Sequence, residues 1–232
     1  MNKINNRKIS VILSAKDSES SLGNAIESIL NQTYENFELL IMDDGSTDNT
    51  YQIVSQFSSR DKRIKLLKNK ENQGLTISLN RLVQHSRGEY IARQDADDFS
   101  YPNRLEEQYE YLISKNLDAC TTKAISLQSS KIIHKKSQYL PKKIVIKFKN
   151  PFVHGTLLIK KSILERLNNY DENFYYSQDY KLVTDLIDSG YKINILNKVL
   201  YKLNTENNIS SINKEEQEYY ADCVRKNLTP LR

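Results

Sequence analysis

The sequence predicts an α/β protein with a mostly parallel central sheet and helices on both faces. Two observations support this class. Short apolar runs rich in β-branched residues alternate with segments whose apolar residues recur every three or four positions, the order expected of strands and amphipathic helices. The strand-like runs are apolar at consecutive positions, which indicates strands covered on both faces. A chain of 232 residues, 27% of them charged, fits one globular domain of this class.

The first hundred residues alternate strands and helices without a break. The predicted strands cover residues 9–13, 37–42, 64–67 and 90–92. The predicted helices lie between them, over residues 22–30, around 53–57 and over 75–85. Asp17 or Ser18 is suited to cap the first helix, and Ser46 or Thr47 the second, because their side chains accept hydrogen bonds from free backbone N–H groups. This series predicts right-handed crossovers and a ligand site beyond the carboxyl ends of the strands.

The second half has a less regular pattern. Helices are expected over residues 102–113, 161–167, 179–188 and 215–224. Strands are expected over residues 118–127, 156–159, 192–196 and 199–203. Residues 170–177 are predicted to form an aromatic loop, and the lysine-rich stretch after residue 127 fits either a hairpin or a helix.

Five carboxylates follow two of the predicted strands. Asp43 and Asp44 come after the second strand, and Asp95, Asp97 and Asp98 come after the fourth. The carboxyl ends of parallel strands share one edge of a sheet, so we expect the two groups to converge. Three carboxylates within four residues repel one another unless a cation, an arginine or solvent neutralises them. A hard divalent cation that keeps water ligands and shares a phosphate-bearing substrate is one solution. A solvated acidic turn is the alternative.

Other nucleotide and metal chemistries lack their sequence signatures. No Gly-x-Gly-x-x-Gly follows the first strand and no Walker lysine loop occurs, which argues against a dinucleotide-dependent dehydrogenase and a P-loop enzyme. Cys120 and Cys223 have neither Cys-x-x-Cys spacing nor a nearby histidine, so a zinc site or a disulfide framework is not expected. No apolar run approaches the ~20 residues of a membrane span, and the start has no signal-peptide pattern. We therefore expect a cytoplasmic location.

The formal net charge of +5 is distributed unevenly. No aspartate or glutamate occurs between Lys123 and Lys161, whereas residues 131–149 contain seven lysines. A solvated lysine surface is the ordinary explanation. The alternative is attraction to a phosphorylated acceptor or to an anionic membrane, which would place the protein peripherally at the inner membrane face. The stretch has neither an arginine-rich nor an aromatic-interleaved pattern, so nucleic acid is not an expected partner.

Seven motifs in a fixed order resemble one protein family. They are Ser10-Val11-Ile12, Ile29-Leu30-Asn31-Gln32-Thr33-Tyr34, Asp43-Asp44-Gly45-Ser46-Thr47-Asp48, Asn72-Gln73-Gly74-Leu75, Gly88-Glu89-Tyr90-Ile91-Ala92, Asp95-Ala96-Asp97-Asp98 and Asn150-Pro151-Phe152-Val153-His154. With these motifs the chain resembles, from about Lys8 to Leu203, an inverting nucleotide-sugar glycosyltransferase of glycosyltransferase family 2. The resemblance implies the GT-A fold, with a Rossmann-like sheet and a small acceptor-side subregion. It implies one domain over residues 1–204, divided into a nucleotide-binding half (1–103) and an acceptor-binding half (104–204). Residues 205–232 are then expected to form a helical or poorly ordered tail.

The resemblance implies a nucleotide-diphosphate site along the sheet edge. Asp44 matches the family's aspartate that contacts uracil, and closing the turn at Gly45 is its alternative role. Asp97 matches the second aspartate of an Asp-x-Asp motif and is expected to reach Mn²⁺ or Mg²⁺ on the diphosphate, where the metal neutralises charge on the departing UDP. Asp95 is expected to address the ribose or a metal-bound water, and Asp98 to support the others. The remaining residues expected at the donor nucleotide are Asp43, Ser14, Lys16, Gly74 and Ala96.

The resemblance assigns the chemical step to Asp179. Inverting transfer needs a general base opposite the leaving diphosphate, and Asp179 matches the aspartate of the family's Glu-Asp pair, with Gln178 where the glutamate usually stands. Capping the helix that follows is the alternative role. His154 is a candidate contact for the metal, the diphosphate or the acceptor, with a structural histidine as the alternative. Arg104 is a candidate partner of the acidic loop or of phosphate. Tyr176 is a candidate for the acceptor wall, with core packing as its alternative.

Together these roles predict an enzyme that moves one sugar from a UDP-sugar to a glycan or lipid-linked saccharide in bacterial surface polysaccharide or lipopolysaccharide synthesis. The chain has no tryptophan, so the Gln-x-x-Arg-Trp motif of processive synthases is absent and one sugar per encounter is expected. Two other classes stay open. A sugar-nucleotide nucleotidyltransferase would need a Gly-rich basic loop after the first strand, which residues 14–21 do not supply. A catalytically inactive nucleotide-sugar-binding subunit would share the motifs without turnover.

Overall fold

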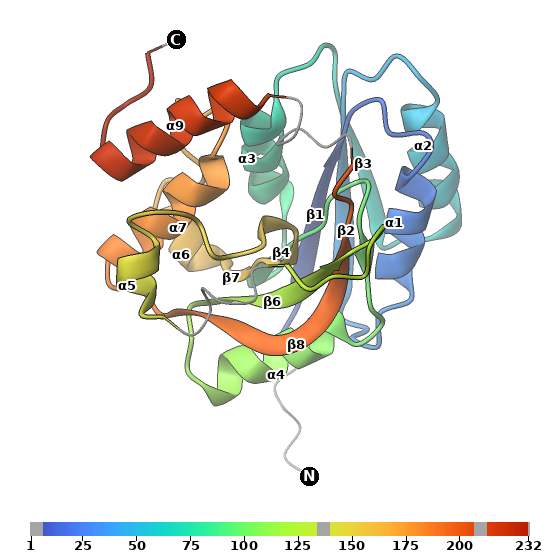
Figure 1. Ribbon diagram of the computed structural model, residues 1–232. Coiled ribbons are helices and arrows are strands. Elements are labelled where there is room, and N and C mark those ends of the chain that lie inside the picture. The colour runs from blue at the N-terminus through green and yellow to red at the C-terminus, as the bar shows by residue number, and fades with distance from the viewer. Residues whose placement is uncertain (1–6, 134–139, 207–212, 232) are drawn as a thin grey trace.

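The computed structural model of the chain describes residues 7–133, 140–206 and 213–231. Within these residues, eight strands form one sheet in the order β3-β2-β1-β4-β7-β6-β8-β5 (Figure 1). The strands are β1 (Ile9–Ala15), β2 (Phe37–Asp44), β3 (Ile64–Asn69), β4 (Tyr90–Arg93), β5 (Phe99–Ser100), β6 (Ala119–Ser126), β7 (Leu158–Lys160) and β8 (Ile193–Leu203). The predicted α/β class is confirmed.

The first four strands form the parallel half of the sheet. β1 lies between β2 and β4 and runs parallel to both, and β2 runs parallel to β3. The register places Ala15 opposite Asp43, and Asp44 opposite Asn69. β4 ends at Arg93, directly before the second carboxylate group. Both carboxylate groups therefore follow strands that end at the same edge of the sheet, as the sequence predicts.

Helices cover both faces of this sheet, because alternate side chains of a strand point to opposite sides. Val11 and Leu13 of β1 pack in one core with α1, α2 and α4, whereas Ile12 packs in a second core with α3, α6 and α7. Figure 1 shows α1 and α2 on one side of β1 to β3 and α3 on the other. The helices are α1 (Leu22–Leu30), α2 (Thr50–Arg60), α3 (Leu75–His85), α4 (Arg104–Ser114), α5 (Lys142–Val145), α6 (Lys161–Arg166), α7 (Gln178–Asp188) and α9 (Lys214–Lys226).

The second half joins the parallel strands through β7, which is antiparallel to both β4 and β6. β8 then pairs in parallel with β6. The two strands predicted over residues 192–196 and 199–203 are in fact one, β8. Register shifts on both sides of Lys123 in β6 accommodate the polar residues Asn197 and Lys198 without ending the strand. The sequence pattern does not predict β5, because its two residues are too few to show a period.

The predicted caps of the first two helices are wrong. α1 begins after Ser21 and α2 begins after Asn49. Asp17 has a left-handed backbone conformation with φ 47°, and its Oδ1 accepts the N–H of Thr47 at 2.8 Å. Asp17 therefore joins the loop after β1 to the loop after β2, along the edge where the carboxylates lie, and does not cap a helix.

The C-terminal helix α9 packs on the same core as the rest of the domain. It lies against α7, and its Cys223 and Val224 are buried in the core shared with α3 and α7. The tail proposed over residues 205–232 therefore contains a docked helix, while its residues 207–212 and 232 lie outside the described part. Among the residues that the structure describes, no helix is long and apolar enough to cross a membrane.

Candidate active site

The acidic loop, residues 94–98, is a structured turn between β4 and β5. Gln94 is fully buried, and its Nε2 donates hydrogen bonds to the main-chain oxygens of Asp95 at 3.0 Å and Asp98 at 3.1 Å. Ser100 Oγ donates to Gln94 Oε1 at 2.6 Å, so the Gln94 amide is held at both ends. Buried hydrogen bonds fix this turn, which argues against an acidic loop shaped by solvent alone.

Two buried side chains lie behind Asp95. Arg93 is fully buried at the end of β4; its Nη2 donates to Asp95 Oδ1, and its Nη1 donates to the Ile12 oxygen at 3.1 Å. Tyr201 of β8 is also fully buried, and its hydroxyl accepts the Asp95 N–H at 3.2 Å. A Cβ atom at Gly155 would fall 2.6 Å from Asp95 Oδ2, so only glycine fits there. Sequence reasoning missed both side chains. An arginine in an otherwise apolar strand, two residues before an aspartate, is the signal for such a buried pair.

Asp97 and Asp98 repel each other and Asp95. Burial, and then the Asp95 charge, raise the pKa of Asp97, although Asn204 Nδ2 donates to Asp97 Oδ2 at 3.0 Å. Burial, with Asp95 and Asp97 nearby, raises the pKa of Asp98 to about 8. The Asn204 N–H donates to Asp98 Oδ1 at 2.6 Å. Asp98 is buried and therefore supports the loop, whereas Asp95 and Asp97 are partly exposed and face outward.

The oxygen ligands of this loop suit a metal that takes most of its ligands from elsewhere. Among the described residues, no three His, Cys, Asp or Glu side chains are grouped so that they could hold a metal ion. Asp95 and Asp97 nevertheless supply hard carboxylate oxygens side by side, and a cation would relieve the repulsion that raises the pKa of Asp97. This donor set fits Mg²⁺ or Mn²⁺ that is otherwise bound by phosphate and water.

His154 lies near both the acidic loop and Asp179. Its Nε2 is 2.9 Å from the Tyr170 hydroxyl, in the short turn before β7. Burial and the Arg93 charge lower the pKa of His154 to about 4, against the Asp179 and Asp95 charges, which raise it. The imidazole is therefore neutral near pH 7, and Tyr170 occupies the nitrogen that would otherwise face a ligand.

Asp179 is the second residue of α7. The residue before the helix is Ser177, with a left-handed φ of 55°, so the alternative role of Asp179 as the helix cap is wrong. Asp179 Oδ2 accepts a hydrogen bond from Asn150 Nδ2 at 2.8 Å. Asn150 belongs to a motif that the sequence singles out, but its contact with a residue 29 positions away is not visible in a linear pattern.

Asp43 and Asp44 differ in how their oxygens are used. Both side chains are buried. Asp44 accepts three hydrogen bonds, from Asn69 Nδ2 at 2.6 Å, from Gln73 N at 2.9 Å and from Gly74 N at 2.9 Å. Asp43 Oδ1 accepts one backbone N–H, whereas Asp43 Oδ2 has no hydrogen-bond partner among the described residues. Asp44 therefore holds the 69–74 turn, whereas Asp43 Oδ2 is buried, accepts no hydrogen bond among the described residues and lies 3.9 Å from Lys68 Nζ.

The other predicted donor-site residues lie on the loops beside Asp43. Ser14 sits near the end of β1, and Lys16 forms an ion pair with Asp17 on the loop that follows. Gly74 has a φ of 87°, and a Cβ there would fall 2.6 Å from the Tyr175 ring. Because Tyr175 belongs to the aromatic loop, the two halves of the chain meet at Gly74.

The aromatic loop, residues 170–177, is held by α3 and α9. Thr76 Oγ1 of α3 donates to the Phe174 oxygen at 2.8 Å. The Tyr176 ring lies 5.7 Å from the Tyr220 ring of α9, centroid to centroid. Tyr176, expected on an acceptor wall, is thus a partly exposed ring that also packs against the C-terminal helix.

Three predicted site residues, Arg104, Ala96 and Gln178, are buried. Arg104 Nη1 donates to the Arg93 main-chain oxygen at 3.1 Å, and its guanidinium lies 5.5 Å from the centre of the Tyr201 ring. Burial lowers the pKa of Arg104 to about 10. Arg104 therefore stabilises the end of β4 by its hydrogen bond to the Arg93 main chain and its contact with the Tyr201 ring.

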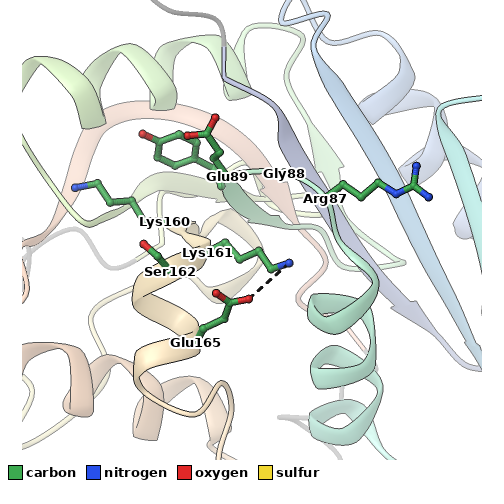
Figure 2. Close-up of a pocket in the computed structure, with 8 residues that line it drawn as sticks. Arg87, Gly88, Glu89, Lys160, Lys161, Ser162 and Glu165 are labelled. Carbon is green, nitrogen blue, oxygen red and sulfur yellow. Dashed lines mark ion pairs between the residues drawn. The ribbon is translucent and has the colours of Figure 1, made fainter.

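A cleft of about 440 Å³ lies at the other end of β4 (Figure 2). Its lining residues are Arg87, Gly88, Glu89, Tyr90, Lys160, Lys161, Ser162 and Glu165. Lys161 Nζ donates to the Ser86 oxygen at 2.7 Å and pairs with Glu165 at 3.6 Å, the contact dashed in Figure 2. The cleft lies at the start of β4, whereas the acidic loop follows its end.

Comparison with known proteins assigns this arrangement to a family. A sequence profile described as "Glycosyl transferase family 2" matches residues 10–183. The chain belongs to glycosyltransferase family 2. It is 34% identical over 205 residues to the protein EpsE of Bacillus subtilis (strain 168), a match that covers 84% of this chain and 72% of EpsE. It is 32% identical over 226 residues to the O-antigen biosynthesis glycosyltransferase WbnJ of Escherichia coli, covering 95% of this chain and 87% of WbnJ.

Solved structures agree with the family's fold. The S. aureus TarS 1–349 complex with UDP superposes with a TM-score of 0.75 at 19% identity, over 97% of this chain and 67% of TarS 1–349. The mannosyltransferase PcManGT from Pyrobaculum calidifontis, in complex with GDP-Man and Mn²⁺, superposes with a TM-score of 0.76 at 17% identity, over 97% of this chain and 66% of PcManGT. The GT-A fold expected from the sequence is confirmed.

Proposed function

We propose that this family 2 glycosyltransferase moves a single sugar, with inversion, from a UDP-sugar to a glycan or lipid-linked saccharide in the synthesis of a bacterial surface polysaccharide or lipopolysaccharide. The observation that carries the proposal is the placement of Asp95 and Asp179 near neutral His154, with partly exposed Asp97 two residues after Asp95, beyond the ends of parallel strands. The name of one relative, 31% identical over 209 residues, supports the donor and acceptor class: UDP-Glc:alpha-D-GlcNAc-diphosphoundecaprenol beta-1,3-glucosyltransferase WfgD of Escherichia coli.

The nucleotide is proposed to bind between the loops after β1, β2 and β3. Asp43 Oδ2 is proposed to accept a hydrogen bond from an N–H of the uracil ring. The resemblance favours Asp44 for this contact, but both Asp44 oxygens already accept backbone N–H groups of the 69–74 turn. Lys16 is placed near the phosphates, with Ser14, Gly74 and Ala96 shaping the walls. A UDP-GlcNAc complex of TarS, with a TM-score of 0.74, supports a uridine nucleotide.

Mn²⁺ or Mg²⁺ is proposed to bind through Asp97, with Asp95 toward the ribose or a metal-bound water. When bound, the metal neutralises charge on the departing diphosphate. Arg93 holds Asp95 from the buried side, and Asn204, whose N–H is bound to Asp98, donates to Asp97. The Mn²⁺ in the PcManGT complex supports a divalent cation.

Asp179 is the proposed general base. In the transfer, the acceptor oxygen forms a bond to the anomeric carbon, the bond to the diphosphate oxygen breaks with its electron pair, and the acceptor proton passes to Asp179. Asn150 orients the Asp179 carboxylate through its 2.8 Å hydrogen bond. The neutral state of His154 avoids a second charge beside the base.

A donor screen tests this function. The purified chain is incubated with each nucleotide sugar of a panel and Mn²⁺, and release of the nucleoside diphosphate is measured with and without candidate saccharide acceptors. We expect slow UDP release without acceptor and faster release with the right one, with a product of inverted anomeric configuration by NMR. Pyrophosphate release from a nucleoside triphosphate would support a nucleotidyltransferase instead, and binding without any turnover would support an inactive subunit.

A further inference from the structure

The α5 surface, residues 140–149, exposes an apolar stripe. Leu140, Ile144 and Phe148 are spaced four residues apart, and their exposed fractions are 56%, 55% and 71%. The Ile146 N–H donates to the Lys142 oxygen at 2.9 Å and the Lys149 N–H to the Val145 oxygen at 3.0 Å, so Ile144 and Phe148 share a helical face, and Leu140 is exposed just before the helix. Large apolar side chains exposed singly are ordinary, whereas a contiguous group of them marks an interaction surface.

Lysines border this stripe. Lys142, Lys143, Lys147 and Lys149 alternate with the apolar residues, and none of the four forms an ion pair among the described residues. No aspartate or glutamate occurs anywhere from residue 124 to residue 160. The neighbouring lysines Lys135 and Lys136 lie outside the described residues. The α5 surface is therefore both apolar and uniformly cationic.

The α5 surface is attached directly to α7. Val145 and Ile146 are buried, and the Tyr180 hydroxyl of α7 donates to the Ile146 oxygen. Figure 1 shows α5 next to α7. Asn150, the residue after the surface, donates to Asp179. Whatever binds the α5 surface is consequently held close to the side of the molecule that carries Asp179.

We propose that the α5 surface docks on a membrane that contains anionic lipids. The lysines attract anionic headgroups, and Ile144 and Phe148 enter the boundary of the acyl chains, the two signals that stable peripheral binding needs. A second copy of this chain is the less suited occupant, because a two-fold contact would place lysine against lysine. Docking does not depend on sugar transfer. Only its consequence, delivery of a lipid-linked acceptor toward Asp179, rests on the proposed function.

Vesicle flotation of the full chain tests the docking. Vesicles of phosphatidylcholine alone are compared with vesicles that also contain phosphatidylglycerol, at low and high salt, without donor or acceptor. We expect binding to the anionic vesicles that weakens as salt rises, and little binding to neutral ones. Equal binding to both vesicle types would overturn the proposal.

Two variants separate the apolar from the ionic contribution. Changing Lys142, Lys143, Lys147 and Lys149 to Gln should lower the vesicle partition coefficient at least tenfold, since each lysine near an anionic surface is worth roughly fivefold. Ile144→Ser with Phe148→Ser should also lower it at least tenfold, because two exposed apolar side chains no longer leave water. Matched controls, Arg60, Lys62, Lys65 and Lys115 changed to Gln and Ile113→Ser with Leu228→Ser, alter exposed residues elsewhere and should bind as the unchanged chain does.

Folding and oligomeric state are measured for each variant so that a loss of vesicle binding can be assigned to the α5 surface. Circular dichroism and UDP-induced thermal stabilisation show whether each variant is folded; if the apolar variant fails to fold, the lysine variant decides alone. Unchanged vesicle binding by the folded α5 variants overturns the proposal. A doubled mass in sedimentation velocity that Phe148→Ser returns to a monomer assigns the surface to a second copy and also overturns it. UDP release without vesicles should be unaffected in all variants, so failure of docking is distinguishable from failure of the transferase assignment.

Discussion

The two ends of β4 are both polar, but their charges are satisfied differently. At the start lies the cleft shown in Figure 2, where Lys161 forms an ion pair with Glu165 and donates a hydrogen bond to the Ser86 oxygen. Glu89 of the same cleft forms an ion pair with Arg7 at 2.8 Å. At the end, the acidic loop brings carboxylates together whose pKa values are raised by burial and by one another. The cleft thus has internally paired charges, whereas in the acidic loop Asp95 pairs with Arg93 and neither Asp97 nor Asp98 has an ion pair among the described residues.

This difference indicates where a ligand is needed. Charges that are already paired gain little from a bound ion, whereas carboxylates that repel one another gain from any cation that enters. Asp97 and Asp98 therefore gain from a cation supplied from outside the chain, whereas Lys161 and Glu89 at the start of β4 already have charged partners. Unsatisfied charge is a better guide to the site than the volume of a hollow.

The largest expected effect is on transfer in Asp179→Asn. Loss of a general base typically costs about 10²–10⁴-fold in rate, so we expect transfer to the acceptor to fall roughly a thousandfold while UDP binding is kept. Transfer rates and calorimetric UDP affinity measure the two properties. Asn150→Ala, which removes the orienting amide, should lower transfer by a smaller factor. Full transfer by purified Asp179→Asn would exclude Asp179 as the base.

Asp97→Asn should lower metal-dependent UDP release by about 10²-fold, because a neutral amide binds a hard cation weakly. The measurement is the initial rate of UDP release as a function of Mn²⁺ concentration. The Mn²⁺ concentration that gives half the maximal rate should rise. Glu89→Gln changes an exposed carboxylate at the other end of β4 and is the matched control. If both substitutions lower the rate equally, the contrast between the two ends of β4 is not functional.

The strands, and the sheet edge that carries the site, could be predicted because short stretches of the sequence are enough to show them. Strands covered on both faces have consecutive apolar residues, so β1, β2 and β4 are visible as runs, and the carboxylates that follow them are placed by the chain itself. The resemblance, and not a local pattern, assigns Asp44 to uracil. Matching residue by residue does not show that both Asp44 oxygens accept hydrogen bonds from residues 69–74.

The contacts that shape the site could not be predicted, because they join distant parts of the chain. Tyr201 reaches Asp95 across 106 residues, and Asn150 reaches Asp179 across 29. Neither pairing has a periodic pattern, since hydrogen bonds between loops depend on how the sheet is assembled. The resemblance gives the residue types at these motifs but not their partners.

Asp43→Asn and Asp44→Asn should have different consequences. Asp43→Asn removes the carboxylate whose Oδ2 accepts no hydrogen bond among the described residues, and it should weaken UDP binding about tenfold, with little loss of stability. Asp44→Asn removes a carboxylate that holds two backbone N–H groups, so it should lower the free energy of unfolding by about 1–3 kcal/mol. Calorimetry with UDP and urea unfolding distinguish the two. Weaker UDP binding only in a stably folded Asp44→Asn would return the base contact to Asp44.

His154 should make stability depend on pH in one direction. An unfolded histidine has a pKa of about 6.5, and burial lowers the folded pKa to about 4. The unfolded state therefore binds more protons between these values, so the contribution of His154 is present above pH ~6.5 and is lost as pH falls toward 4. His154→Gln, which keeps a partner for Tyr170, should reduce the loss of unfolding free energy between pH 7 and pH 4.5 by about 1–2 kcal/mol. Asp97 and Asp98 titrate in both proteins, so the difference between them reports His154. An unchanged pH profile would mean that His154 is not held neutral.

The smallest effect is expected at the start of β4. Lys161→Gln keeps a donor for the Ser86 oxygen and removes only the pairing with Glu165, a partly exposed contact at 3.6 Å. Pairs of this kind contribute about 0–1 kcal/mol, so urea unfolding should shift by less than ~1 kcal/mol and UDP release should not change. Because Lys161 and Glu89 at this end already have charged partners, removing one charge exposes no repulsion that a ligand had relieved. A large loss of UDP release in Lys161→Gln, with the fold intact, would mean that paired charges can also mark a site and that the contrast between the two ends of β4 fails.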